Sequence, residues 1–509
     1  MDQLDSKAYI RMSLKQKTVS GAKWSGISQV ALQILQFLFG VLLARLLIPN
    51  DFGLVGMIMV FGGFVGVLAE MGIGSAIIQK EKISDSQLSS AFWLNVMIGF
   101  SMMMLMFFSA PLLANFFEEP RLIGLTRAIS ITFLLGSLNV VQLSLMAREF
   151  EFKNLAVIEI FTFLTSGVIA VAFAFYGFGV WSLVIRQIIA ILVKTILAKF
   201  LCRWLPSFHF QYDELKELIP YSLNLTGAKT TTYWIRNSDN VLIGKFVGAD
   251  QLGVYSRAYG LMLMPIRKIA GAICKVMLPA LSKIQNDRPR IKRIYLRTLQ
   301  VIAVLTFPIS LGMMAVSDNF VLVLLGGNWL DVAPILQVLC VLGLTQSLGT
   351  TAGVIYQACG RTDLQFKWTI YASAITLLSF VIGLQWGALG VATSYVISSL
   401  VFLLYPGTRI VGSLIDMTFY EYLKNVAGVF GCALTMFWLV VWLGQILQNQ
   451  MMAWKVLTVQ VALGVVVYVV LIAIFRVNGF LEIRDLVASS LKRKSSSLPN
   501  APTTSADAS

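Results

Sequence analysis

Long apolar stretches, separated by short polar ones, recur along the whole chain. A helix needs about 20 predominantly apolar residues to cross the hydrocarbon core of a bilayer, and fourteen stretches reach that length. We therefore predict an all-α polytopic membrane protein. The spans cover approximately residues 19–48, 52–78, 87–110, 121–146, 155–176, 179–201, 219–247, 251–281, 295–316, 332–358, 367–385, 388–408, 423–446 and 453–475.

The spans at 219–247 and 251–281 carry much more charge than the others. Charged side chains at bilayer depth are costly, and they usually face the interior of a bundle or a wet cavity. At ~100° per residue, one face of each helix collects these polar residues. The first face holds Lys229, Thr232, Arg236, Asp239 and Asn240, and the second holds Arg257, Arg267 and Lys268.

Two facing cationic stripes would make a cavity wall suited to an anion. The alternative is that the outer charges snorkel to the lipid headgroups, while Arg236 and Asp239 form an ion pair at i,i+3. For Arg236 we favour the cavity, because a charge placed this deep in a span is a site candidate by default.

The first half of the chain has fewer polar positions within its spans. Gln29 and Gln33 share one face of the first span, and Arg186 and Lys194 lie in the sixth. Acidic residues within or beside spans are candidates for ion coupling or gating, although a structural ion pair is an equal alternative for Glu70 and Glu159. The coupling candidates are Asp51, Glu70, Glu159 and Asp239.

The composition agrees with a membrane protein, since 57% of residues are hydrophobic and only 13% are charged, against about 25% charged in soluble domains. No cleavable signal sequence is expected at the N-terminus. The net charge of +15 does not indicate nucleic-acid binding, because the Lys and Arg residues are concentrated in the loops on one side of the membrane. Placing both termini in the cytoplasm leaves few basic residues in the outside loops and helix ends, as the positive-inside rule requires. Those few are Arg45, Arg121, Lys245 and Lys455.

The two halves of the chain repeat. LARLLIPNDFGLV (43–55) aligns with IGKFVGADQLGVY (243–255) at an offset of 200, and GFGVWSLV (177–184) resembles GALGVATSYV (387–396). Six spans separate the copies, so both halves have the same orientation in the membrane. We expect a cytoplasmic N-terminus (1–18), an N-lobe (19–201), an interlobe loop (202–218), a pseudo-symmetric C-lobe (219–410), two extra spans (411–476) and a largely disordered cytoplasmic tail (477–509). The longest outside loop is predicted at 317–331.

Motifs of catalysis are missing from the sequence. The five cysteines lack metal-ligand spacing, and neither a GxxxxGK[ST] phosphate loop nor an HExxH motif occurs. We therefore expect no enzyme, no cofactor, no metal site and no ATP-binding site. Energy for transport would come from an ion gradient, from substrate flow or from another subunit.

Several segments resemble one family of transporters. They are SGAKWSGISQ, LLARLLIPNDFGLV, EMGIGSAIIQ, FGVWSLV, RNSDNVLIGKFVGADQLGVYSRAYGL, KVMLPALSKIQ and NWLDVAPILQVL. These segments, spread over residues 13–410, resemble the Wzx-type polysaccharide flippases of the multidrug/oligosaccharidyl-lipid/polysaccharide exporter superfamily. Within it they are most similar to the colanic acid and teichuronic acid exporter branch.

The resemblance implies two six-helix lobes around a cationic cavity, in the inner membrane of a bacterium. The implied substrate is a polyprenyl-diphosphate-linked oligosaccharide, flipped to the periplasmic leaflet by proton- or sodium-coupled alternating access for surface polysaccharide biosynthesis. Membrane lipids, and a polymerase and chain-length regulator of the same pathway, are the implied partners. Substrate binding is assigned from the residues alone to Arg236, Lys229, Arg257, Lys268, Arg267, Thr232, Asn240, Gln29 and Gln33.

Two other functions remain open at this stage. A cation or drug antiporter of the same superfamily would need an acidic cavity, whereas basic residues outnumber acidic ones in both stripes. A membrane-embedded polysaccharide polymerase or ligase would need a sizeable outside loop with Arg or His groups. The outside loops here are short, and the single histidine of the chain, His209, is not in one of them.

Overall fold

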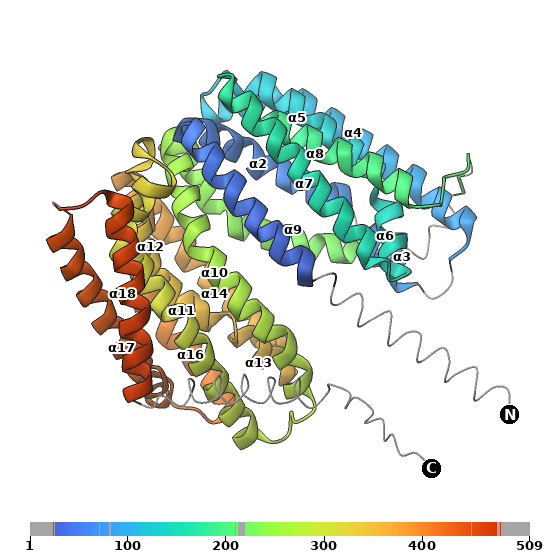
Figure 1. Cartoon of the computed structure of the whole chain (residues 1–509). Coiled ribbons are helices and arrows are strands. Elements are labelled where there is room, and N and C mark those ends of the chain that lie inside the picture. Colours follow the sequence, from blue (N-terminus) through green and yellow to red (C-terminus); the bar gives the residue numbers. More distant parts are fainter. Residues whose placement is uncertain are drawn as a thin grey trace, which may run out of the picture. The chain divides into compact units, whose positions relative to one another are not determined.

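The structure is a computed structural model that describes residues 24, 26–70, 72–80, 83–208, 210–211, 219–448, 450–475 and 479. These residues form helices and no strand (Figure 1). After a first helix at Gly26–Leu46, the α-helices are α2 (Pro49–Glu70), α3 (Ile73–Gln79), α4 (Asp85–Phe117), α5 (Leu122–Ser137), α6 (Val140–Arg148), α7 (Phe152–Phe175), α8 (Val180–Leu201), α9 (Ile219–Phe246), α10 (Ala249–Ser282), α11 (Arg288–Leu324), α12 (Val332–Gly349), α13 (Ala352–Ala358), α14 (Thr362–Gly383), α15 (Gly387–Ser398), α16 (Leu404–Ile415), α17 (Phe419–Leu447) and α18 (Ala453–Ile474). The predictions for residues 1–18 and for the tail from 480 onward lie outside the described residues.

Each predicted span coincides with one helix or with two consecutive ones. Nine helices of the described chain are long and apolar enough to cross a membrane, and α5 with α6, bent by 42°, makes a tenth. Helices α8, α9 and α10 are 22, 28 and 34 residues long, which also suffices to cross a bilayer. The prediction of an all-helical polytopic chain is confirmed.

The predicted outside loop at 317–331 is wrong for its first half. Helix α11 continues to Leu324, because the apolar residues after Ser317 extend it. The chain leaves the helix near Gly326, whose φ of +97° suits glycine. What remains is a short connection with a 3₁₀ turn at Gly327–Trp329.

The helices form two compact units. Unit 1 comprises the chain up to Arg257 together with Leu324–Val332 and Phe380–Val391. Unit 2 comprises Ala258–Val323, Ala333–Ser379 and the chain from Ala392 onward. Unit 1 therefore includes α9 and the first residues of α10, so it does not coincide with the predicted N-lobe (19–201). Those lobe boundaries stay a prediction.

The repeat at an offset of 200 is visible in the helices. The first helix ends at Leu46 and α2 begins at Pro49, while α9 ends at Phe246 and α10 begins at Ala249. In the second pair of repeated segments, Gly177 and Gly387 have φ of +82° and +69°. Both copies need glycine there because side chains rarely adopt positive φ.

Within unit 1, α2 crosses the start of α10 at direct backbone contact. A Cβ on Gly53 would overlap the carbonyl oxygen of Ala249, and a Cβ on Gly253 would overlap that of Pro49. Glycine lets helix backbones approach this closely. The two glycines are equivalent positions of the repeat, so the contact is reciprocal.

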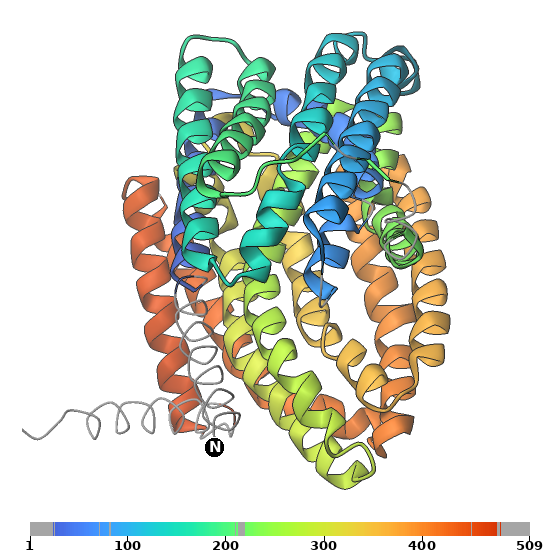
Figure 2. The same cartoon turned by 90° about the vertical axis from the view of Figure 1, so that its right-hand side faces the viewer.

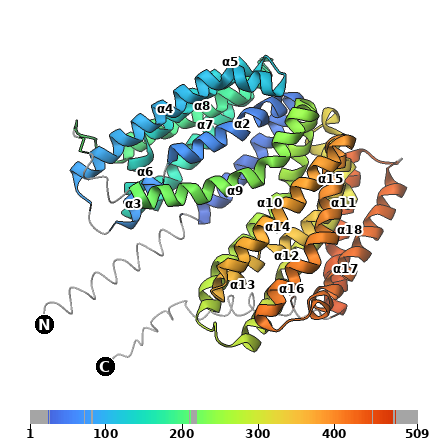
Figure 3. The same cartoon turned by 180° about the vertical axis from the view of Figure 1, so that it is seen from behind.

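Unit 2 contains the two extra helices, α17 and α18, which lie side by side (Figure 3). They pack on α11, where the Tyr468 hydroxyl donates to the carbonyl of Val304 at 2.8 Å. Near the start of α11, Lys292 Nζ lies 2.7 Å from Glu421, which also completes the capping box of α17. A short turn joins α10 to α11 (Figure 2). The extra helices therefore complete the core of unit 2.

Candidate functional site

The side chain of Arg257, on α10, lies against aromatic rings in unit 1. Its Cζ is 4.1 Å from the centre of the Phe52 ring on α2 and 5.8 Å from that of Trp329. Its Nε–H donates to no acceptor in the described part of the chain. A cation over an aromatic face is stabilised by the ring quadrupole, but its charge is not neutralised.

Trp329 reaches this position because a distant segment packs on the first helix. Its indole N–H donates to the carbonyl of Ala44 at 2.7 Å, and its side chain is fully buried. Arg45 Nε donates to the carbonyl of Leu324 at 3.1 Å, at the start of the same segment. The Trp329 and Phe52 rings then meet edge to face with centres 5.2 Å apart. Each of these contacts helps to fix the aromatic surface beneath Arg257.

A second half-buried guanidinium has the same kind of setting. Arg186, on α8, lies with Cζ 4.9 Å from the centre of the Phe163 ring on α7. Its charge is close enough to act electrostatically on Arg257. We call these two arginines, with Phe52, Phe163 and Trp329, the arginine site.

Several cations elsewhere in the described chain pair with carboxylates. Lys245 Nζ lies 2.6 Å from Glu118, and the hydrogen bond it donates lowers the pKa of that carboxyl. Arg121 likewise pairs with Glu119 at 2.7 Å and lowers its pKa. Among the described residues, no carboxylate pairs with Arg186 or Arg257, and aromatic rings lie beside their guanidinium groups instead, so both positive charges remain for an anionic ligand. A guanidinium can hold phosphate oxygens bidentately.

Among the described residues of unit 1, Asp239 on α9 is a buried acid. Its carboxylate accepts hydrogen bonds from the Tyr255 hydroxyl at 3.1 Å and from the backbone N–H of Asn240 at 2.8 Å. These groups, rather than Arg236, satisfy it, so the alternative of an Arg236–Asp239 ion pair is not what the structure contains. Arg236 itself is exposed on the same helix.

The other predicted site residues differ in their burial and in the unit to which they belong. Arg267 and Lys268 lie in unit 2 with exposed side chains, so their proximity to Arg236 stays a prediction. Gln29 and Glu159 are exposed, and Gln33 and Asn240 are half-buried. Asp51 accepts a hydrogen bond from the backbone N–H of Ile48, which is a structural use of its carboxylate. The side chains of Lys229, Thr232 and Glu70 lie outside the described residues.

Sequence reasoning missed three partners of Arg257 in this arrangement. Arg186 was visible as a charge within a span, which is the signal that could have included it. Phe52 and Trp329 gave no such signal, because an aromatic residue in a membrane protein is ordinarily core. Among the described residues, no group of His, Cys, Asp or Glu could hold a metal ion.

Comparison with known proteins decides the family. The model of the family described as "Polysaccharide biosynthesis protein" matches residues 42–334, more than half of the chain. The chain belongs to this family. The resemblance inferred from its motifs is confirmed.

Two relatives of this polysaccharide biosynthesis protein each match at 30% identity. The lipopolysaccharide biosynthesis protein WzxC of Escherichia coli (strain K12) aligns over 77% of this chain and 80% of its own. The teichuronic acid biosynthesis protein TuaB of Bacillus subtilis (strain 168) aligns over 81% and 86%. Among solved structures, the lipid II flippase MurJ in an inward closed conformation matches with a TM-score of 0.69 at 20% identity, covering 91% of this chain and 99% of that one. This likeness shows a shared multi-pass transporter fold.

Proposed function

We propose that the protein is a flippase that moves a polyprenyl-diphosphate-linked oligosaccharide from the cytoplasmic to the periplasmic leaflet by alternating access. The observation that carries the proposal is the arginine site, where Arg186 and Arg257 rest on aromatic faces and keep their charge for an anion. The family and the names of the two relatives place the activity in the biosynthesis of surface polysaccharide. The protein acts as a transporter rather than as a catalyst.

A diphosphate with attached sugars cannot cross hydrocarbon unaided, because each desolvated charge or hydroxyl costs several kcal/mol. Arg257 and Arg186 would replace water around the phosphates, with Arg236 as a further cation on α9. The remaining predicted binding residues would extend this surface, and the prenyl chain would stay in lipid. They are Lys229, Thr232, Asn240, Arg267, Lys268, Gln29 and Gln33.

Asp239 is our choice for ion coupling, since it is buried and bonded to groups that accommodate either protonation state. Asp239→Asn in liposomes should still equilibrate the lipid-linked sugar, but an imposed proton or sodium gradient should no longer accelerate it. Asp51→Asn is the matched control and should keep the acceleration, because Asp51 caps a backbone N–H. The opposite pattern would assign coupling to Asp51.

We place the protein in the bacterial inner membrane with both termini in the cytoplasm. In a variant without native cysteines, the thiol introduced by Glu118→Cys should react with a membrane-impermeant maleimide in spheroplasts. The thiol introduced by Asp287→Cys should react only after the membrane is permeabilised. Both side chains are exposed, so their accessibility to the reagent depends on the side of the membrane. The reverse labelling would invert the topology. A polymerase and a chain-length regulator would be the partners on the pathway.

A cation or drug antiporter of the same fold is the second candidate, and the uncompensated positive charge of the arginine site disfavours it. The test is a reconstituted assay in which purified protein receives a fluorescent polyprenyl-diphosphate oligosaccharide and a membrane-impermeant reagent reports the leaflet. We expect the lipid-linked oligosaccharide to change leaflet faster in liposomes that contain the protein than in empty liposomes. Efflux of small organic cations without movement of the lipid-linked sugar would favour the antiporter, and chain elongation would favour a polymerase or ligase.

A further inference from the structure

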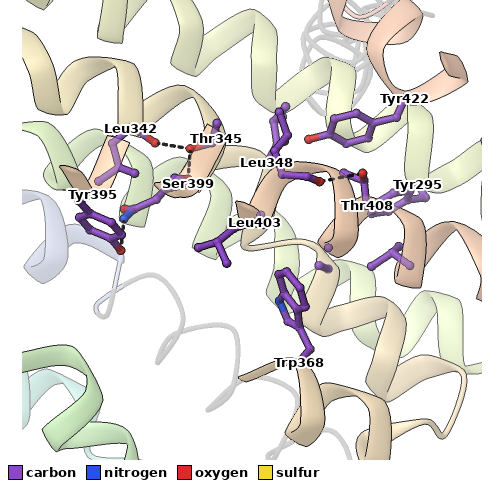
Figure 4. A pocket seen from close by; sticks show the side chains of 16 residues that line it. Tyr295, Leu342, Thr345, Leu348, Trp368, Tyr395, Ser399, Leu403, Thr408 and Tyr422 are labelled. Carbon is purple, nitrogen blue, oxygen red and sulfur yellow. Dashed lines mark hydrogen bonds between the residues drawn. The ribbon is translucent and has the colours of Figure 1, made fainter. Parts of the chain in front are cut away.

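A cavity of about 200 Å³ lies inside unit 2 and shares no lining residue with the arginine site. Its walls come from α11, α12, α13, α14 and α17 and from the helical stretch between α15 and α16 (Figure 4). Pockets for drug-sized ligands measure roughly 300–1,000 Å³. This cavity therefore has room for a single ring, and the rest of an oligosaccharide would extend through its open side.

An aromatic side chain from α14 gives the cavity a fixed apolar surface. Trp368 reaches into it in Figure 4, and Tyr395 lines it farther along. Trp368 also packs against α16, where a Cβ on Gly407 would lie 2.8 Å from its ring. A ring held in this way presents a flat apolar face with a polar N–H at its edge.

Neutral polar groups accompany these rings. Gln346 Nε2 donates to the Tyr395 hydroxyl at 3.1 Å, and the hydroxyls of Thr345 and Ser399 are 3.2 Å apart. The Gln346 amide and the Thr345 and Ser399 hydroxyls have bonding capacity beyond these bonds. The described residues that line the cavity include none with a charged side chain.

The backbone beside the cavity departs from a regular helix. Between α15 and α16 the chain forms a π-helical segment, Ser399–Leu403, and both of its end residues line the cavity. π-helical turns are rare and occur frequently at functional sites. This irregular turn is an observation independent of the side chains, and it points to the same place.

We infer that this cavity binds one uncharged sugar ring, which stacks on Trp368 and hydrogen-bonds to Gln346, Thr345 and Ser399. The absence of charged lining side chains argues against a phosphate or a uronic acid as occupant. An isoprenoid chain has no polar atoms, so it could not use the remaining hydrogen-bonding capacity of the Gln346 amide and the Thr345 and Ser399 hydroxyls. The inference rests on the proposed function, since the ring would belong to the transported saccharide.

Binding of free sugars to the purified full-length protein tests the inference. Glucose, galactose and N-acetylglucosamine would be screened by saturation-transfer NMR, with glucuronate and farnesol as charged and isoprenoid probes. At least one neutral sugar should bind. Trp368→Ala should weaken that binding about ten-fold, as expected for loss of a stacking contact. Gly349→Leu should abolish it, because a Cβ at this lining position meets no atom within 4 Å and the leucine side chain would take up space that the sugar needs.

Two controls separate binding from folding. Trp368→Phe keeps an aromatic face and should retain most of the binding. Trp438→Ala removes an exposed tryptophan of α17 that does not line the cavity, and it should leave binding unchanged. Binding of farnesol in preference to every sugar would overturn the inference, as would sugar binding that survives both Trp368→Ala and Gly349→Leu.

The flipping assay distinguishes the two proposals. Native protein that moves the lipid-linked oligosaccharide, with Gly349→Leu moving it equally fast, would leave the flippase standing and remove the sugar cavity. Native protein that binds neutral sugar at this cavity but moves no lipid-linked sugar would remove the flippase instead. Slower movement in Gly349→Leu, together with lost sugar binding, would support both.

Discussion

Arg257→Gln is expected to slow flipping of the lipid-linked oligosaccharide roughly ten- to a hundred-fold. Gln is similar in polarity but carries no charge. A hydrogen bond to a charged group contributes about 1.5–3 kcal/mol, and each 1.4 kcal/mol is a factor of ten. The reconstituted leaflet assay measures the loss, with the amount of inserted protein determined in parallel. The flipping rate of Arg257→Lys should lie between those of the native protein and Arg257→Gln. A lysine ammonium keeps the charge, but it cannot hold two phosphate oxygens as a guanidinium does.

A matched control is Arg121→Gln, which removes a guanidinium already neutralised by Glu119. An exposed ion pair contributes little, so transport should stay near the native rate. The double variant Arg186→Gln/Arg257→Gln should lose less than the product of the two single losses, since residues that act on one ligand are not additive. Normal transport by Arg257→Gln at normal abundance would show that the arginine site is not where the anion binds.

Gly53→Ala should destabilise the protein more than other glycine substitutions in its helices. The new Cβ would overlap the backbone carbonyl of Ala249, which cannot move without separating α2 from α10. Overpacking costs about 1–3 kcal/mol, which corresponds to a decrease of about 2–12 °C in Tm at about 2–4 °C per kcal/mol. Thermal unfolding of the purified protein, followed by size-exclusion chromatography, measures the effect.

Gly253→Ala should behave in the same way, because its Cβ would overlap the carbonyl of Pro49. Gly260→Ala, farther along α10, is the matched control, since its Cβ meets nothing within 4 Å. There alanine should leave Tm unchanged or raise it, as its helix propensity is higher. Equal Tm values for Gly53→Ala and Gly260→Ala would mean that the close crossing of the two helices does not matter for stability.

The spans were predictable because the signal for them is local. About 20 apolar residues in succession cross a bilayer wherever they lie in the chain, and the repeat at an offset of 200 predicted the shared helix break near residues 47 and 247. The end of α11 was not predictable in this way. Apolar residues after Ser317 suited either a helix or an interfacial loop, and the structure continues the helix to Leu324.

The sequence by itself determined the membrane class, the helices, the family and Arg257 as a candidate, because each depends on composition, spacing or adjacent residues. Only the tertiary structure decided which groups accompany that arginine. Trp329 hydrogen-bonds to Ala44 across 285 positions of the chain, and Arg186, on another helix, is close enough to act electrostatically on Arg257. The cavity of unit 2 likewise joins Trp368, Gln346 and Ser399 from separate helical segments. Such contacts arise from packing between helices. The pattern of apolar residues along one helix does not predict which other helices it packs against.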